Sequence, residues 1–156
     1  MKQAARSDEL AIATNRKALH DYEVLERVEA GLVLRGTEVK SIREGGFNFR
    51  DGWVEPRNGE MFLSGVRIGP YSHGNLMNHS EDRARKLLLH RHQIDKLGGR
   101  VAEKGFTLVP LRAYFKGGKV KIEIGLARGK KSHDKRETLK RKDIDRETRQ
   151  AMNRRR

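Results

Sequence analysis

The sequence predicts a mainly β fold, a small antiparallel barrel of the oligonucleotide-binding (OB-like) type with flanking short helices and a basic C-terminal tail. Three observations support this prediction. Apolar and polar residues alternate from about Leu19 onward, turn residues separate about six alternating segments, and apolar residues become sparse after Gly129. Antiparallel strands in this number close most economically into a barrel, which leaves no free edge. An open α+β sheet is the alternative.

The chain divides into three segments. Residues 1–15 are mostly charged or small and are predicted to form a flexible arm, with a brief helix over Ala4–Ala13 as the alternative. Residues 16–129 are predicted to form the OB-like domain. Residues 130–156 hold 12 Lys and Arg against 5 Asp and Glu, a net charge of +7, which is half of the chain's +14. We therefore expect a folded body and a basic tail with separate roles.

The first half of the body contains a long alternating segment and a short helix. Even-numbered positions from His20 to Leu34 are mainly apolar, which indicates a half-buried strand or a hairpin that turns near Glu29-Ala30-Gly31. Residues 36–46 are predicted to form a helix. Thr37 can cap its first free N–H groups, and Gly45 can end it in the left-handed conformation.

A hairpin follows. Strands are predicted over Trp53–Pro56 and Met61–Ile68, and the Asn58-Gly59 dipeptide between them is a strong hairpin signal. Pro56 has no N–H to donate to a neighbouring strand, so its strand is expected at an edge of the sheet.

The second half of the body is predicted to end in two clear strands. Residues 70–80 form a polar loop, Arg83–His90 a strand, and His92–Lys104 a helix whose apolar residues share one face. Alternating apolar residues then predict strands over Thr107–Phe115 and Val120–Leu126.

Composition points to a polyanionic partner. The pI is near 10.4 and 36% of residues are charged. An anionic membrane surface would require an apolar anchor, and the longest aliphatic runs, Leu10–Ala13 and Leu87–Leu89, are far too short to span a bilayer. No apolar signal-peptide core follows Met1, and the chain has no cysteine, which suits a reducing cytoplasm. Nucleic acid in the cytoplasm is therefore the expected partner.

Enzyme signatures are weak. Gly125–Lys130 resembles a phosphate-binding loop, but it is one residue short, and Lys131 stands where a magnesium-binding Ser or Thr is needed. Ser132-His133-Asp134 contains the residue types of a catalytic triad, but sequence neighbours cannot form that spatial arrangement. His90 and His92 fall short of the three or four converging ligands of a metal site. We expect no catalytic residue, no metal and no cofactor.

Basic clusters are the stronger candidates for function. They are nearly single-signed and lie beside histidine and tyrosine, a combination that suits phosphate contacts with neighbouring base stacking. The alternative is that these charges form solvated faces. The candidate residues from these clusters are Arg16, Lys17, His20, Tyr22, Arg83, Arg85, Lys86, His90 and Lys121.

The tail carries a narrow apolar stripe. Ile144, Thr148, Ala151 and Met152 fall at helical spacing, but a helix of this composition is marginal alone in water. It could become ordered along RNA, which would neutralise its lysine and arginine charges. The alternative is a disordered solubilising tail.

Seven motifs together resemble a known family. Their order from Asn15 to Arg136 is similar to that of the bacterial SsrA-binding protein family (small protein B, SmpB). Gly52-Trp53 departs from the Ser-Tyr of that family but keeps an aromatic residue. The motifs are Asn15-Arg16-Lys17-Ala18, His20-Asp21-Tyr22, Glu29-Ala30-Gly31, Gly36-Thr37-Glu38-Val39-Lys40-Ser41, Arg85-Lys86-Leu87-Leu88-Leu89-His90, Gly129-Lys130-Lys131 and Asp134-Lys135-Arg136.

The resemblance implies a six-stranded OB-type barrel with flanking helices and no enzymatic activity. It implies that the protein binds the tRNA-like part of transfer-messenger RNA (tmRNA) as a monomer in a 1:1 complex. It further implies delivery, with elongation factor Tu, to ribosomes stalled without a stop codon, where the small-subunit rRNA is a partner. A permanent rRNA-binding ribosomal protein and an RNA-modifying enzyme remain as alternatives.

The resemblance also implies roles for particular residues. Glu29, Leu88, His90 and Lys121 correspond to RNA-binding positions of the family. The tail is expected to be disordered in the free protein and helical in the empty mRNA channel. The residues expected to enter the ribosomal decoding centre and mRNA channel are Gly129, Lys130, Lys131, His133, Asp134, Lys135 and Arg136.

Overall fold

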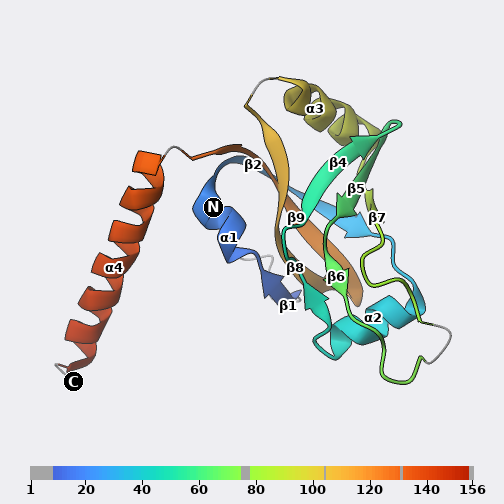
Figure 1. Cartoon of the computed structure of the whole chain (residues 1–156), viewed down its shortest axis with the longest axis horizontal. Coiled ribbons are helices and arrows are strands. Elements are labelled where there is room, and N and C mark those ends of the chain that lie inside the picture. Colours follow the sequence, from blue (N-terminus) through green and yellow to red (C-terminus); the bar gives the residue numbers. More distant parts are fainter. Residues whose placement is uncertain (1–8, 75–77, 104, 131, 155–156) are drawn as a thin grey trace.

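The computed structural model describes residues 9–74, 78–103, 105–130 and 132–154, and the chain is mainly antiparallel β-sheet with a few helices (Figure 1). The mainly β prediction is therefore confirmed. The strands are β1 (Glu9–Thr14), β2 (Tyr22–Leu32), β3 (Phe47–Asn48), β4 (Trp53–Arg57), β5 (Glu60–Ser64), β6 (Arg67–Ile68), β7 (Arg85–Leu88), β8 (Thr107–Lys116) and β9 (Lys119–Gly129). The helices are α1 (Arg16–Asp21), α2 (Gly36–Arg43), α3 (Arg91–Ala102) and α4 (Ser132–Arg154).

The main sheet forms a closed circuit of strand pairs. Its order is β1-β8-β4-β5-β7-β2-β9, and β9 also pairs with β8. The six strands β8, β4, β5, β7, β2 and β9 therefore form a ring in which each strand pairs with two neighbours. The link between β4 and β8 is narrow, because it consists of the single pair Val54↔Leu108. β1 pairs with β8 outside this circuit, and β3 and β6 form a separate two-stranded sheet.

The core lies inside this circuit because alternate residues of each strand point inward. Helices α2 and α3 lie at opposite ends of the sheet in Figure 1, and each contributes an aliphatic side chain to the same core. Removing these side chains from water is the main favourable contribution to folding of the body. The buried members include Ile42, Met61, Leu63, Leu87, Leu97, Leu108, Ile122, Ile124 and Leu126.

The first described residues correct the prediction of a flexible arm. Residues 9–14 form β1, which pairs antiparallel with β8, and Ile12 and Ala13 pack against the core. The free edge of β8 supplies hydrogen-bond partners that no local pattern in Glu9–Thr14 could reveal. The brief helix considered over Ala4–Ala13 is wrong from Glu9 onward, and residues 1–8 lie outside the described residues.

Helix α1 is an element that the sequence prediction missed. Asn15 caps it, since its side-chain oxygen accepts from Ala18 N at 3.1 Å while its Nδ2 donates to Pro110 O at 2.8 Å. Ala18 is buried with Val109 and Leu111 in a small cluster beside β8. These contacts join the start of the chain to β8.

Several local predictions are confirmed and one alternative is wrong. The β4–β5 turn occurs at Asn58-Gly59, with φ angles of 49° and 77°, and Gly45 has a φ of 88° after α2. The hairpin considered near Glu29-Ala30-Gly31 is wrong, because β2 continues through it. The predicted strand Met61–Ile68 divides into β5 and β6 near Gly65, whose φ is 72°.

Helix α2 forms where predicted but begins differently. Its N-cap is Arg35, whose N–H donates to Glu38 Oε1 at 2.9 Å. The Thr37 hydroxyl instead lies 2.9 Å from Nδ1 of His79 in the loop that follows β6. The predicted second helix also forms, as α3.

Helix α4 projects away from the body (Figure 1). The chain reaches it through Lys130, whose N–H donates to Asp21 O at 2.9 Å, and its first turn lies beside α1. Ile144 and Met152 are 53% and 65% exposed, so the apolar stripe of α4 is uncovered by the described part of the chain.

Candidate nucleic-acid interface

The β2–β9 pair separates the candidate residues into two groups. At one end Tyr22 pairs with Gly129, and at the other Gly31 pairs with Lys121. Nine residues of β-strand span roughly 30 Å. We call Glu29, Leu88, His90 and Lys121 the β7 surface. We call Arg16, Lys17, His20 and Tyr22, together with Gly129 and Lys130, the α1 surface.

The β7 surface comes together across three strands. Leu88 at the end of β7 pairs with Gly31 of β2, which pairs on its other side with Lys121 of β9. Its four residues line one shallow pocket of about 350 Å³ together with Gly31, Leu89 and Gln93. Leu88 is 55% exposed and so offers an apolar contact at this surface. The four residues that the family resemblance marks are thus brought together, although they span more than half of the sequence.

Glu29 is held by residues that sequence reasoning did not single out. The buried Tyr114 hydroxyl donates to Oε2 of Glu29, and Lys116 Nζ lies 3.4 Å from the same oxygen. Burial, reinforced by the hydrogen bond to Glu29, raises the pKa of Tyr114, so the hydroxyl stays protonated and remains a donor at neutral pH. The other oxygen, Oε1, accepts no hydrogen bond from the described residues. Glu29 therefore presents one oriented acceptor oxygen at the surface.

A second layer of contacts supports Tyr114. The Arg112 guanidinium lies 4.1 Å from the Tyr114 ring centroid, and it donates to Glu9 at 3.0 Å and to Glu123 at 3.1 Å. Arg27 donates to the other Glu123 oxygen at 2.7 Å. Although burial opposes ionisation, the hydrogen bonds from these two arginines lower the pKa of the Glu123 carboxyl. One feature of the sequence could have drawn attention to Tyr114. It is an aromatic residue on the polar face of β8, between Arg112 and Lys116.

Arg85 is a correction to the predicted RNA-binding set. Its side chain is fully buried, where it donates to Glu38 at 2.7 Å, to Val66 O at 2.8 Å and to Glu81 O at 2.9 Å. Although burial opposes ionisation of Glu38, hydrogen bonds from Arg83, from the backbone and from Arg85 hold its pKa below the ordinary value. The guanidinium of Arg85 holds strands and loop together and is not accessible to RNA phosphate.

Two cations close to Arg85 in the sequence, Arg83 before β7 and Lys86 within it, are more exposed than Arg85. Arg83 also binds Glu38, with Nε 3.2 Å from its oxygen, and its side chain is 25% exposed. Lys86 forms a 3.0 Å ion pair with Glu60, and both side chains are nearly half exposed. Exposed pairs of this kind are weak and exchange readily for other partners, so Lys86 is the more accessible of the two.

The α1 surface consists mainly of exposed charge. Arg16 is exposed, and Lys17 pairs with Asp51 at 2.7 Å, which raises the pKa of the lysine through the hydrogen bond. His20 Nδ1 lies 2.9 Å from the Asp21 carboxylate, and Tyr22 is partly buried beside them. The chain leaves the body for α4 next to these residues.

The predicted decoding-centre stretch lies at that exit. Gly129 ends β9 and Lys130 follows it, whereas Lys131 lies outside the described residues. The backbone of His133, Asp134, Lys135 and Arg136 forms the first turns of α4, and their side chains lie outside the described part of the structure.

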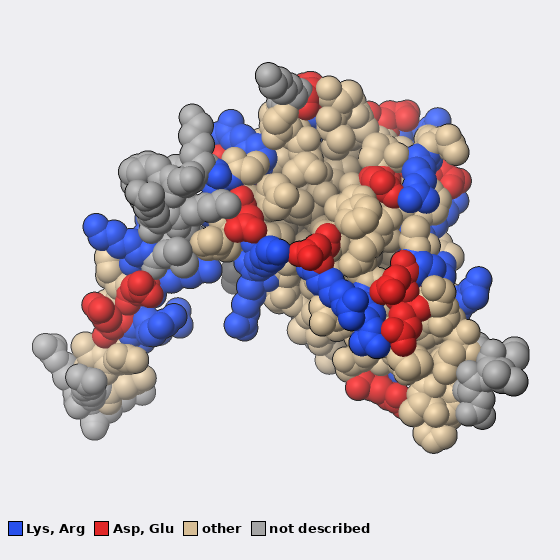
Figure 2. Space-filling view, viewed as in Figure 1, with Lys and Arg blue, Asp and Glu red and all other residues tan. Residues whose placement is uncertain are grey.

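Charges of both signs cover the face shown in Figure 2. Lys and Arg intermingle with Asp and Glu over the body and α4, and an uncharged area occupies the upper middle of the view. In the described residues, no group of three or more His, Cys, Asp or Glu could hold a metal ion. Of the helices that the structure describes, none is long and apolar enough to cross a membrane.

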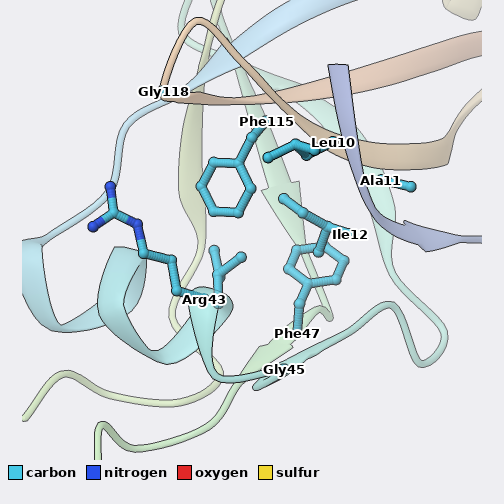
Figure 3. A pocket seen from close by; sticks show the side chains of 9 residues that line it. Leu10, Ala11, Ile12, Arg43, Gly45, Phe47, Phe115 and Gly118 are labelled. Carbon is cyan, nitrogen blue, oxygen red and sulfur yellow. The ribbon is translucent and has the colours of Figure 1, made fainter. Parts of the chain in front are cut away.

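A cavity of about 580 Å³ lies between β1, the C-terminal end of α2, β3 and the β8–β9 turn. Leu10, Ile12, Phe47 and Phe115 point toward one another within it, and the Arg43 guanidinium lies at its side (Figure 3). Its walls are therefore apolar apart from one cation.

The fold and these surfaces define a small, mainly antiparallel β protein with exposed groups suited to nucleic acid and a projecting basic helix. A family model described as SmpB protein matches residues 12–154. The chain belongs to the SmpB family.

Individual relatives agree with this assignment. The chain is 58% identical over 144 residues to the SsrA-binding protein of Pelobacter propionicus, covering 92% of this chain and 95% of that protein. It is 59% identical over 136 residues to the SsrA-binding protein of Enterococcus faecalis, covering 87% and 88%. A solved structure concerning tmRNA–SmpB and the bacterial ribosome is similar, with a TM-score of 0.67 and 46% identity, covering 83% of this chain and 94% of that one.

Proposed function

We propose that this protein binds the tRNA-like part of tmRNA through the β7 surface and delivers it to stalled ribosomes for trans-translation. Family membership supports this function, and so do the names of the relatives, which are SsrA-binding proteins. The observation that carries the assignment to a surface is that Glu29, Leu88, His90 and Lys121 line one pocket.

The chemistry of the β7 surface suits RNA. Lys121 can contact a phosphate, and the free oxygen of Glu29 can accept from a ribose 2′-hydroxyl or a base amino group. Leu88 offers an apolar contact. His90 stacks on His92, with ring centroids 5.6 Å apart and an angle of 7° between the planes, and so offers a flat surface to a base.

The closed circuit of strand pairs supports a barrel of the OB-like type for the body, 16–129, joined by the strand β1. The α1 surface is proposed as a second RNA contact, through Arg16, Lys17, His20 and Tyr22. On the ribosome the tail, 130–156, would pass from this surface into the decoding centre and the empty mRNA channel and contact small-subunit rRNA. Its projection from the body supports this role.

Three further features follow from the family. The protein would act in the cytoplasm, as a monomer in a 1:1 complex with tmRNA, and elongation factor Tu would accompany that complex to the ribosome. It would chiefly occupy stalled ribosomes, whereas a permanent ribosomal protein would be present on all of them in near-equal amounts.

The test is binding of a transcript of the tRNA-like part of tmRNA to four proteins: the wild type, Glu29→Ala, Lys121→Ala and the matched control Lys96→Ala. Lys96 lies on α3, pairs with Glu26 of β2 and does not line the pocket of the β7 surface. We expect Glu29→Ala to weaken binding and to lower the melting temperature modestly, because the buried Tyr114 hydroxyl loses its acceptor. Lys121→Ala should also lower the slope of log affinity against log salt by roughly 0.7 to 0.9. Wild-type affinity and slope in both variants would exclude this surface.

A further inference from the structure

A second recess adjoins the β7 surface. It encloses about 280 Å³ and shares Gly31, Leu88 and Lys121 with the pocket that contains Glu29 and His90. The remaining walls are Leu32, Leu34, Val39, Gly118, Lys119 and Val120.

Gly31 keeps this recess open. A Cβ at this position would lie 3.2 Å from Leu88 Cβ and 3.7 Å from Lys121 Nζ, within the space between them. Gly31 is not among the glycines with positive φ, so its backbone conformation does not require glycine. Glycine inside a strand costs stability and often marks a place where a ligand or another backbone approaches closely.

The charges around the recess have one sign. Lys119 and Lys121 line the recess together with the apolar residues Leu34, Val39 and Val120, and no Asp or Glu of the described part of the chain lines it. Apolar walls flanked by cations suit a nucleobase whose own backbone phosphates lie beside it. A partner protein would have to supply both an apolar anchor and acidic groups at this spacing, and it would compete with RNA for Leu88 and Lys121.

We propose that this recess receives one unstacked nucleobase of the bound RNA, with Lys119 and Lys121 contacting the phosphates next to it. The proposal rests on the proposed function, because continuity with the β7 surface identifies RNA as the occupant. It adds a base-binding site to that surface, and it explains why glycine follows Glu29-Ala30.

Variants that fill the recess test the proposal. Gly31→Ala narrows the opening, and Val39→Trp fills it from α2. Val33→Trp is the matched control, since Val33 is 42% exposed and does not line the recess. Loss of one base contact should weaken the binding of both recess variants to the tRNA-like transcript about fivefold or more. The control should bind like the wild type.

Salt dependence separates a base contact from a phosphate contact. Gly31→Ala and Val39→Trp remove no cation and should keep the wild-type salt slope, whereas Lys119→Ala should lower it by roughly 0.7 to 0.9. Melting temperatures of all variants identify any that is destabilised.

A fluorescence measurement on the wild-type protein does not depend on any variant. Transcripts carry 2-aminopurine at one unpaired position at a time, and its fluorescence rises when the base leaves the stack. We expect one position to brighten on binding and to lose that response with Gly31→Ala. Brightening at no position, or wild-type affinity of both recess variants while Lys121→Ala is weakened, would overturn the recess proposal alone. Wild-type affinity of Lys121→Ala and Glu29→Ala would overturn the proposed function of the surface.

Discussion

The body buries its apolar residues, whereas helix α4 exposes them. Ile124 and Leu87 are 1% exposed inside the circuit of strands, whereas Ile144 and Met152 on α4 are 53% and 65% exposed. Within α4 the Thr148 hydroxyl donates to Ile144 O at 2.9 Å, a contact along the same helix. The body is stabilised by its own packing, whereas the described part of the chain leaves the apolar stripe of α4 uncovered, so we expect α4 to gain stability from a surface outside this chain. The comparison therefore predicts that the body holds RNA by itself and that α4 acts only in a specific environment.

The largest effect is expected from Arg85→Ala in the body. Arg85 is the fully buried ion-pair partner of Glu38, so this change leaves the buried Glu38 carboxylate without that partner. Removing one member of a buried ion pair typically lowers the unfolding free energy by about 3–5 kcal/mol. Thermal and denaturant unfolding should show the loss. Arg83→Ala is the matched control and should cost less, because its side chain is 25% exposed. Equal costs would show that the buried pair has no special role.

The same pair should make body stability depend on acid pH. Hydrogen bonds from the arginines outweigh burial and hold the folded pKa of Glu38 below its ordinary value of 4.5. Its contribution is therefore fully present above about pH 4.5 and is lost as the pH falls through the folded pKa. Melting temperature measured from pH 3 to pH 6 should fall on the acid side. A Glu38→Gln variant, compared over the same range, should have a lower melting temperature near pH 6 and a shallower fall. An equally steep fall in both proteins would assign the acid sensitivity to other carboxyls.

Tyr114→Phe should have a smaller effect, and it should act on RNA affinity. Removing the hydroxyl frees the Glu29 carboxylate, and we expect a loss of about 1 kcal/mol, roughly fivefold, in binding to the tRNA-like transcript. The effect should disappear in a Glu29→Ala background, since Tyr114 acts by positioning Glu29. Tyr71→Phe is the control for loss of a tyrosine hydroxyl. An undiminished effect in the double variant would assign Tyr114 a purely structural role.

The smallest effect is expected on α4. Ile144→Ala and Met152→Ala remove exposed side chains, so the unfolding free energy of the body should change by less than about 0.5 kcal/mol. Chemical denaturation followed by Trp53 fluorescence reports on the body alone, because Trp53 is the one tryptophan of the sequence. A cost above 1 kcal/mol would show that α4 packs on the body.

Local sequence patterns correctly predicted the strands and turns that are determined by residues close together in the sequence. The alternation of Ile122, Ile124 and Leu126 predicted β9, and Asn58-Gly59 predicted the turn between β4 and β5. Arg85 was misassigned because the partner that buries it, Glu38, lies 47 residues away and its own neighbours in the sequence look like a basic surface cluster. β1 was missed for a related reason, since its pairing depends on the free edge of β8.

In the candidate site, too, some features were predicted from the sequence and others depend on contacts between distant residues. Family resemblance identified Glu29, Leu88, His90 and Lys121, and residue chemistry identified RNA as a partner. The contact of Tyr114 with Glu29 could not be predicted, because it depends on the register of β8, β9 and β2, which the sequence alone does not give. Gly31 belongs to a motif that is visible in the sequence, but only the strand register places it between Leu88 and Lys121.

The most direct test of the division into body and tail is a paired assay on two variants, deletion of residues 137–156 and the triple change of Asp134, Lys135 and Arg136 to Ala. One arm measures binding to the tRNA-like transcript, and the other measures tag addition in a reconstituted translation system with stalled ribosomes. We expect both variants to bind RNA within about twofold of the wild type, because neither change touches a strand of the body. Both should lose tag addition. If the truncated protein supports tag addition at the rate of the full-length protein, the account is contradicted, because the tail would then be only a solubilising appendage.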